Sequence, residues 1–255
     1  MFADDQLTQN AFLGGRLTLF QPRDGYRAGV DPVLLASAVP ARAGQSVLEL
    51  GCGAGAAVLS LLTRVGGVRG HGVELQPEYA DLARRNAAQN KLLLDVTCAD
   101  LSALPDEVRQ QRFNHVIANP PYYRSGAHSP ARDIGRSVAL GGATPLATWV
   151  EVAARRLLPK GYLHVIQRID RLPDLISACT GRLGSLEVLP LAARPGRAPA
   201  LMILRARKEG KSPFRLHAPQ ILHHGDHHTA DVESYVPEIR AVLRDGAILN
   251  WPALR

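Results

Sequence analysis

The run with the clearest chemical potential is Asn119-Pro120-Pro121-Tyr122, which directly follows the apolar segment FNHVIA. Proline fixes φ and has no N–H group, so the two prolines end a strand and leave carbonyl groups facing outward. The Asn119 side-chain oxygen and the Pro120 carbonyl can each accept one hydrogen of a planar NH2 group. Such contacts favour the pyramidal nitrogen that attacks a methyl group in line. Tyr122 can stack on the face of a base. We therefore expect these four residues to form the catalytic site of a transfer to an amino group.

A second informative run, VLELGCGAG at residues 47–55, places three glycines between a strand and a helix. Glycines allow the backbone to approach a ligand closely, and a helix N-terminus favours negative charge. A tight turn that packs the helix on the strand would explain the same glycines. Glu49 lies just before them, and an acid at this point suits a cationic ligand better than a pyrophosphate. This favours S-adenosylmethionine, with its sulfonium and ammonium groups, over a dinucleotide.

Two more acids follow at the ends of the next two strands. Glu74 can accept hydrogen bonds from both ribose hydroxyls of a nucleoside, and Asp100 can face an adenine amino group. Alternatively, Asp100 caps a helix that starts at Leu101. Because the carboxyl ends of neighbouring parallel strands share one edge of a sheet, these acids should meet the glycine run there. The predicted residues that bind S-adenosylmethionine are Glu49, Gly51, Gly53, Gly55, Glu74, Leu75, Asp100, Leu101 and Asn119.

The elements that position these runs alternate regularly between strands and helices. This order predicts βαβ units and right-handed crossovers. After one more helix at 171–184, the strands 185–193 and 199–208 form an antiparallel hairpin around Arg194-Pro195-Gly196-Arg197. The predicted fold is α/β, with a Rossmann-like, seven-stranded, mostly parallel sheet that ends in this hairpin. The other predicted strands are 46–51, 70–75, 92–100, 113–121 and 161–167, and the helices between them are 56–65, 77–90 and 144–159.

Short additions flank this core. Residues 16–30 alternate apolar and polar side chains around Arg23-Asp24-Gly25 and predict a hairpin. Asp31 then reads as the N-cap of a short helix with Pro32 at its first position. We expect one main domain at 41–210, an N-terminal extension at 1–40, and a tail at 211–255 that packs on the domain and carries an amphipathic helix near 232–244.

Composition restricts the partners and the compartment. The 255 residues carry a formal net charge of +7, which favours a polyanionic partner. The three cysteines are far apart, and there is no signal-peptide pattern and no apolar run long enough to span a membrane, so we expect a cytoplasmic protein. The predicted RNA-binding residues are Arg124, Arg132, Arg136, Arg194 and Arg197. We expect further positive charge at or beside the carboxyl edge of the sheet, from Arg205, Arg207, Lys208, Lys211 and Arg215.

The tail also contains a histidine-rich run, HHGDHH at residues 223–228. Its four histidines and Asp226 could chelate a metal ion. A methyl transfer needs no metal, so a polar surface loop is the preferred interpretation, and no metal site is predicted. Cys52, inside the glycine run, is interpreted as a small packing residue.

Taken together, VLELGCGAG, GVEL, CAD and NPPYY resemble the class I S-adenosylmethionine-dependent methyltransferases of the amino-methylating N-P-P-[YFW] group. The flanks FLGGRLTLFQPRDGYRAGVDPVLL and ARPGRAPALMILRARK resemble the bacterial tRNA1(Val) adenine N6-methyltransferases, and the likeness covers about residues 10–245. The resemblance implies that Gly51, Gly53 and Glu74 bind the cofactor, Asp100 its adenine, and 119–122 the target amine of a tRNA adenine beside the anticodon. Glu49 departs from the aspartate frequent in the family, and the histidine-rich run has no counterpart in its pattern.

Other interpretations stay open at this point. Methylation of a glutamine amide in a release factor also uses a planar NH2, but such enzymes carry a helical domain where this chain has only about 45 residues. DNA adenine methylation would call for a target-recognition insertion, which is not visible. A non-catalytic S-adenosylmethionine- or RNA-binding module would have no physical reason to keep both amine acceptors. The oligomeric state cannot be predicted from these patterns.

Overall fold

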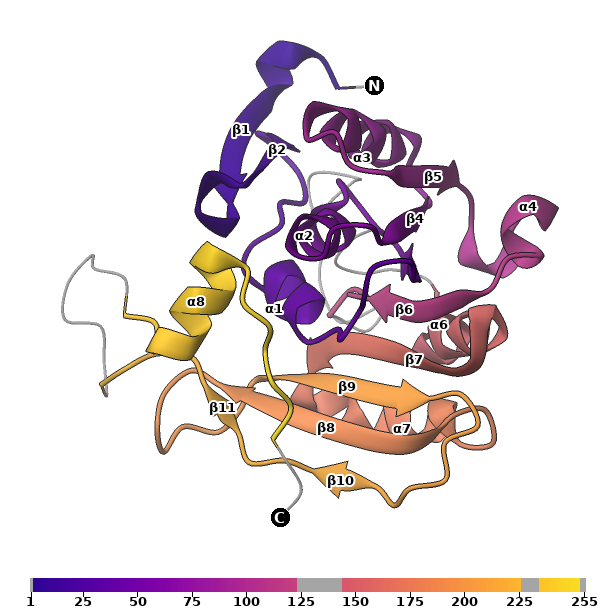
Figure 1. Ribbon diagram of the computed structural model, residues 1–255, viewed down its shortest axis with the longest axis vertical. Coiled ribbons are helices and arrows are strands. Elements are labelled where there is room, and N and C mark those ends of the chain that lie inside the picture. Colours follow the sequence, from indigo (N-terminus) through magenta and orange to yellow (C-terminus); the bar gives the residue numbers. More distant parts are fainter. Residues whose placement is uncertain (1, 123–143, 226–233, 253–255) are drawn as a thin grey trace, which may run out of the picture.

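A central sheet organises the chain (Figure 1), in a computed structural model that describes residues 2–122, 144–225 and 234–252. Seven strands run in the order β5-β4-β3-β6-β7-β9-β8, and within this set only β9 is antiparallel to its neighbours. The predicted seven-stranded sheet with a terminal hairpin is confirmed. Its strands are β3 (Ser46–Leu50), β4 (Arg69–Glu74), β5 (Leu94–Cys98), β6 (Phe113–Ala118), β7 (Leu157–Arg168), β8 (Gly184–Ala192) and β9 (Leu201–Arg207).

Two strands of two residues each extend the sheet beyond the seven that the sequence predicts. β10 (Arg215–Leu216) and β11 (Gln220–Ile221) both pair in parallel with β8. They lie in the tail, where so short a strand leaves no alternation of polar and apolar residues to recognise. The edge of the sheet is therefore covered by the tail.

Helices cover both faces of the sheet, and strand residues alternate between the two resulting cores. The helices are α1 (Asp31–Ser37), α2 (Ala56–Arg64), α3 (Pro77–Gln89), α4 (Asp106–Arg109), α6 (Leu146–Arg156), α7 (Leu172–Cys179) and α8 (Pro237–Asp245); the short 3-10 turns are η1 (Asp4–Gln6), η2 (Leu13–Gly15), η3 (Leu101–Ala103) and η4 (Ile169–Arg171). In β6, Ile117 packs into the core under α1, α2 and α8, whereas Val116 packs into the core under α6 and α7.

The N-terminal hairpin exists, but its predicted position is wrong. Its strands are β1 (Leu7–Phe12) and β2 (Leu17–Pro22), which pair from Leu7 opposite Pro22 to Phe12 opposite Leu17. The turn passes through Gly14 and Gly15, with φ of 65° and 92°, rather than through Arg23-Asp24-Gly25. Left-handed φ at two adjacent positions is tolerated best by glycine, so the Gly-Gly pair makes the tighter connection.

The C-terminal helix α8 joins this hairpin to the core. Ile239 and Val242 are buried in the same apolar cluster as α1. The Arg16 guanidinium, just after the hairpin turn, donates a 2.7 Å hydrogen bond to the Asp245 carbonyl at the end of α8. Hairpin, α1 and α8 thus lie together on the side toward which β6 points (Figure 1). Among the described residues, no helix has both the length and the apolar character needed to cross a membrane.

Candidate active site

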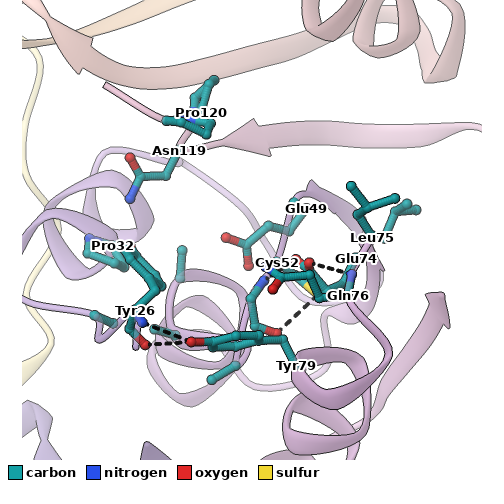
Figure 2. A pocket seen from close by; sticks show the side chains of 18 of the residues that line it. Tyr26, Pro32, Glu49, Cys52, Glu74, Leu75, Gln76, Tyr79, Asn119 and Pro120 are labelled. Carbon is teal, nitrogen blue, oxygen red and sulfur yellow. Dashed lines mark hydrogen bonds between the residues drawn. The ribbon is translucent and has the colours of Figure 1, made fainter. Parts of the chain in front are cut away.

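A cavity of about 620 Å³ opens at the carboxyl ends of β3, β4 and β6. It brings together nearly all of the predicted catalytic and cofactor-binding residues, all of which are described; of these only Gly55 does not line it. Figure 2 shows Asn119 and Pro120 on one side, Tyr26 and Tyr79 on the opposite side, and the two buried glutamates on the wall between them. The predicted residues in its lining are Glu49, Gly51, Gly53, Glu74, Leu75, Asp100, Leu101, Asn119, Pro120, Pro121 and Tyr122.

The three glycines of the turn have different reasons to be glycine, although all have left-handed φ. A Cβ on Gly51 would lie 2.5 Å from the Trp149 ring, and one on Gly55 would lie 3.0 Å from Leu59. A Cβ on Gly53 would meet nothing closer than the Tyr26 ring at 3.9 Å. The packing interpretation therefore holds for Gly51 and Gly55, and Gly53 is the glycine that leaves its backbone open to a ligand.

Glu49 is a buried carboxyl group at the centre of the wall, with only 3% of its surface exposed. Its Oε2 accepts a 2.8 Å hydrogen bond from the Val58 N–H in the first turn of α2. Burial, reinforced by the neighbouring Glu74 charge, raises the pKa of Glu49 to about 8 in spite of this bond. A carboxyl group held neutral by burial gains most from a cationic ligand, because a cation restores its charged form.

Glu74 connects the glycine turn to the end of β4. Its Oε2 accepts from the Gly53 N–H at 2.8 Å, and its Oε1 accepts from the Gln76 N–H at 2.9 Å. Burial raises the pKa of this carboxyl group, and the backbone donors limit the rise. Each carboxylate oxygen has a second lone pair, so Glu74 can hold the turn and still accept two hydroxyl groups.

Asp100 has the capping role that the sequence left open as an alternative. Its Oδ1 accepts from both the N–H and the hydroxyl of Ser102, at 2.7 and 2.8 Å, at the start of η3. These bonds lower the pKa of Asp100. The residue still lines the cavity, and both bonds are made by one oxygen, so Oδ2 is available to a ligand.

The backbone of the Asn-Pro-Pro-Tyr run is held by a residue that the sequence does not single out. Gln167, fully buried near the end of β7, donates from Nε2 to the Pro120 carbonyl at 3.1 Å and to the Pro121 carbonyl at 3.3 Å. Its Oε1 accepts from the Arg168 N–H at 2.9 Å. A carbonyl oxygen has two lone pairs, so Pro120 can bind Gln167 and a substrate amine together. Gln167 therefore holds the backbone of the Asn-Pro-Pro-Tyr run in position.

Tyr122 is tied to the N-terminal extension. Its hydroxyl donates a 2.5 Å hydrogen bond to Asp31 Oδ2, and burial together with the Asp31 charge raises the pKa of Tyr122. The prediction that Asp31 caps its own helix is wrong: Val30 is the N-cap residue, and the structure shows no capping bond from a side chain there. The carboxylate instead fixes the tyrosine across the cavity mouth.

The sequence patterns also do not single out two aromatic residues of the opposite wall, Tyr26 and Tyr79. The Tyr79 hydroxyl accepts from the Tyr26 N–H at 2.9 Å and donates to the Tyr26 carbonyl at 3.2 Å, which fixes the segment that leads into α1. Tyr79 lies in the amphipathic pattern of α3, where nothing in one sequence separates it from a core residue. Cys52 is buried and would contact a Cβ on Gly72, as expected of a packing residue.

Of the five arginines that were predicted to bind RNA, the structure describes two, and these differ in exposure. Arg124, Arg132 and Arg136 lie outside the described residues. Arg197 is exposed in the β8–β9 turn, which lies at the same edge as the cavity because Leu201 pairs with Arg168. Arg194 does not reach the surface: it is 7% exposed, and its guanidinium donates to the carbonyls of His224 and Gly225. The expectation that Arg194 contacts RNA is therefore corrected.

The rest of the basic cluster lies elsewhere than expected. Arg207 pairs with Tyr162 near the start of β7, toward the opposite edge of the sheet from the cavity. Arg205 makes an ion pair with Glu187 at 2.8 Å and stacks over Trp251, and Lys208 donates to the Ala154 carbonyl. These side chains stabilise the terminal hairpin and its covering tail. An antiparallel strand carries its last residues away from the edge at which it begins, which explains the error.

The histidine-rich run divides at the limit of the described residues. His223 stacks on Tyr235 with ring centroids 4.5 Å apart, and its Nδ1 lies 3.0 Å from the Ser234 hydroxyl. Residues 226–233, which include Asp226, lie outside the described part of the chain. Within the described part, no three ligating side chains gather in a metal-binding arrangement.

The strand order, the glycine turn and the carboxylate-lined cavity define the architecture of a class I S-adenosylmethionine-dependent methyltransferase. Residues 28–183, more than half of the chain, match the methyltransferase small domain family. The chain belongs to this family.

Individual relatives agree with this assignment. A Porphyromonas gingivalis protein named tRNA1(Val) (adenine(37)-N6)-methyltransferase is 32% identical over an alignment of 217 residues, and the match covers 78% of this chain and 83% of that protein. The solved structure of a predicted O-methyltransferase, Atu636 from Agrobacterium tumefaciens, is 25% identical with a TM-score of 0.68 and covers 86% of this chain and 98% of that one. The Thermus thermophilus 16S rRNA N2 G1207 methyltransferase in complex with AdoMet and guanosine has the same fold, with a TM-score of 0.56, 22% identity, and coverage of 79% of this chain and 50% of its own.

Proposed function

We propose that the protein transfers the methyl group of S-adenosylmethionine to the exocyclic N6 amino group of an adenine in the anticodon loop of tRNA, with tRNA1(Val) as the expected substrate. One observation carries this proposal: Asn119 and Pro120, two acceptors suited to a planar amine, line the same cavity as the buried carboxyl groups of Glu49 and Glu74. Residues 41–210 form the proposed methyltransferase domain, with additions at 1–40 and 211–255.

The cavity suits S-adenosylmethionine in charge and in shape. Among the described residues, four carboxyl groups line it, those of Asp31, Glu49, Glu74 and Asp100, against one arginine. A cation therefore enters favourable surroundings, whereas a pyrophosphate would be repelled. The open backbone at Gly53 allows close approach, and a volume of about 620 Å³ is in the range of sites that enclose a small molecule. Glu49 and Gly53 would hold the methionine part, Glu74 the ribose, and Asp100 with Leu75 and Leu101 the adenine.

When bound, S-adenosylmethionine supplies an electrophilic methyl group on its sulfonium, and the new nitrogen–carbon bond forms as the sulfur–carbon bond breaks. The residues of the chain activate the other partner. Asn119 Oδ1 and the Pro120 carbonyl accept the two amino hydrogens, which draws the nitrogen lone pair out of the ring system and toward the methyl group. Gln167 holds the Pro120 carbonyl in place, and Tyr122, fixed by Asp31, offers its ring to the base. The methylated nitrogen then loses its extra proton to water.

Adenine in an RNA loop is the preferred substrate on physical grounds as well as by similarity. The target base has to leave its stack to reach the cavity, and this costs less in a loop than in a duplex. The net charge of +7 suits a polyanion. We propose Arg197 together with Arg124, Arg132 and Arg136 as phosphate contacts. This substrate implies a cytoplasmic enzyme, and the proposed transfer requires no metal ion.

A methyl-transfer assay separates the competing substrates. The protein is incubated with methyl-labelled S-adenosylmethionine and, in separate reactions, with unmodified tRNA, duplex DNA or a translation release factor. We expect label in tRNA, recovered as N6-methyladenosine after nuclease digestion. Label confined to the release factor would identify a glutamine methyltransferase, and label confined to DNA a DNA enzyme; either result would overturn the proposal. Cofactor binding without any transfer would point to a binding module instead.

A further inference from the structure

A second cavity of about 350 Å³ lies between the N-terminal hairpin, the segment that enters α1, and α8. We call it the flanking groove. Leu13 and Val33 are buried at its base, with half-buried apolar side chains around them and exposed arginines at its margin. Figure 1 shows the elements that form it, β1, β2, α1 and α8, beside one another. The side chains that characterise it are Phe12, Leu13, Arg27, Val33, Tyr235, Leu243 and Arg244.

The flanking groove adjoins the active-site cavity through one segment of chain. Gln21 and residues 27–29 line both cavities. This partition is rigidly held: Arg27 donates to the Pro22 carbonyl and the Thr8 hydroxyl, both at 2.7 Å, and Gln21 Oε1 accepts from the Ala28 N–H at 2.7 Å. Only two residues beyond the partition, Asp31 fixes Tyr122. The groove therefore opens next to the expected position of the target base.

The two cavities differ in charge. In the described part of the chain, the active-site cavity is lined by four carboxyl groups and a single arginine, whereas the lining of the flanking groove contains Arg27 and Arg244 and no acidic side chain. The first suits a cation and the second an anion. The groove also presents aromatic rings, those of Phe12 and Tyr235, above an apolar base. An apolar pocket with aromatic walls and a cationic margin matches a nucleobase joined to a phosphate.

We propose that the flanking groove binds the nucleotide that adjoins the methylated adenine in the RNA strand. Its base packs among Phe12, Leu243 and Tyr235, and its phosphate lies near Arg27 and Arg244. This inference rests on the proposed function, since it specifies how the same substrate is held. Extrusion of the target adenine unstacks its neighbour, and a second apolar pocket compensates for the lost stacking. The additions at both ends of the chain thus serve substrate binding, because hairpin and α8 build the groove together.

Two substitutions test the groove without touching the residues that line the active-site cavity. Ala11→Trp fills the groove from the exposed side of β1, and Arg244→Glu reverses the charge at its margin. Arg240→Glu is the matched control, because it makes the same charge change at an exposed site of the same helix that does not line the groove. The substrate is an anticodon stem-loop RNA. Cofactor affinity and the thermal unfolding midpoint, measured for each variant, verify the fold.

We expect Ala11→Trp and Arg244→Glu each to raise the KM for the RNA about tenfold, with kcat and cofactor affinity nearly unchanged. Ala11→Trp prevents the base from stacking, and Arg244→Glu replaces attraction to the phosphate with repulsion. The control should behave like the wild type. Making one nucleotide beside the target adenine abasic should cost the wild type about tenfold as well, and should cost Ala11→Trp little more. A wild-type KM in both groove variants, or an equal rise in Arg240→Glu and Arg244→Glu, would overturn the groove proposal. Failure of the wild type to methylate any RNA would instead refute the proposed function.

Discussion

Replacing Glu49 with glutamine tests the electrostatics of the proposed cofactor site. In the ligand-free protein, burial raises the pKa of Glu49 from 4.5 to about 8. The unfolded chain ionises this group near its ordinary pKa, whereas the folded protein keeps it protonated. The resulting contribution to folding stability is fully present below pH 4.5 and is lost as the pH rises toward 8. Glutamine has the same shape and never ionises, so it removes this pH dependence.

The structure sets the size of the effect. At pH 7.5, about three units above its ordinary pKa, keeping Glu49 neutral costs on the order of 4 kcal/mol. At pH 7.5 the free energy of unfolding of Glu49→Gln should therefore exceed that of the wild type by up to about this amount. At pH 4.5 the two proteins should be about equally stable. The same change should weaken cofactor binding about 10- to 100-fold, because the acceptor that faces the cation loses its negative charge.

Urea unfolding at pH 4.5 and 7.5, with calorimetric titration of S-adenosylmethionine at pH 6.5 and 7.5, measures both consequences. Wild-type affinity should rise up to about tenfold between the two titrations, since a proton no longer competes with the cation. The variant should show no such rise. A Glu49→Gln protein that binds the cofactor as tightly as the wild type, or that has the same relative stability at both pH values, would refute this account of Glu49.

Three other substitutions examine residues that support the site. Gln167→Leu removes the donor to the Pro120 carbonyl and should lower kcat, measured by single-turnover transfer, about 100-fold with little change in cofactor affinity. Restored turnover in Gln167→Asn would argue that any donor suffices. Unchanged kcat in Gln167→Leu would argue that Gln167 does not position the carbonyl. Asp31→Asn removes the charged partner of Tyr122 and should raise the KM for RNA about tenfold, whereas an unchanged KM would show that the bond does not orient the ring. Burial lowers the pKa of His115 to about 4, so the wild type should lose about 3 kcal/mol of stability as the pH falls from 6.5 to 4. His115→Gln should lessen that loss, measured by urea unfolding at both pH values. An equal loss of stability in the variant and the wild type would contradict this account of His115.

Local patterns were sufficient to predict the core of the fold. Strands such as 113–118 and helices such as 77–89 carry unambiguous periodicity, and their regular alternation leaves little choice of topology. The predicted residues that line the cavity come from segments at the carboxyl ends of parallel strands. These ends share one edge of the sheet, so the residues could be expected to meet there. Gly55 is the exception: it does not line the cavity, and it lies at the N-cap of α2, packed against Leu59.

Contacts between distant segments could not be predicted. Gln167 reads as an ordinary polar residue in a strand until β6 and β7 are known to be neighbours, and its partners lie 46 and 47 residues earlier. The Asp31–Tyr122 bond spans 91 residues. Arg194 carried a charge that suggested RNA, yet tertiary packing buries it against the tail. In each case the local sequence predicts one role, such as a helix cap or a solvated arginine. A contact with a residue far away in the sequence then gives the side chain a different role in the folded chain.

The most direct test of the central claim is the rate of methyl transfer by Asn119→Ala to an anticodon stem-loop RNA, with the affinity for S-adenosylmethionine measured in parallel. In the proposed mechanism Asn119 supplies one of the two acceptors for the target amine, and losing a preorganised polar contact of this kind costs about 100- to 1,000-fold in rate. We predict a loss of this size, with cofactor affinity nearly unchanged and N6-methyladenosine as the wild-type product. A variant that keeps most of the wild-type rate would contradict the account of the amine pocket.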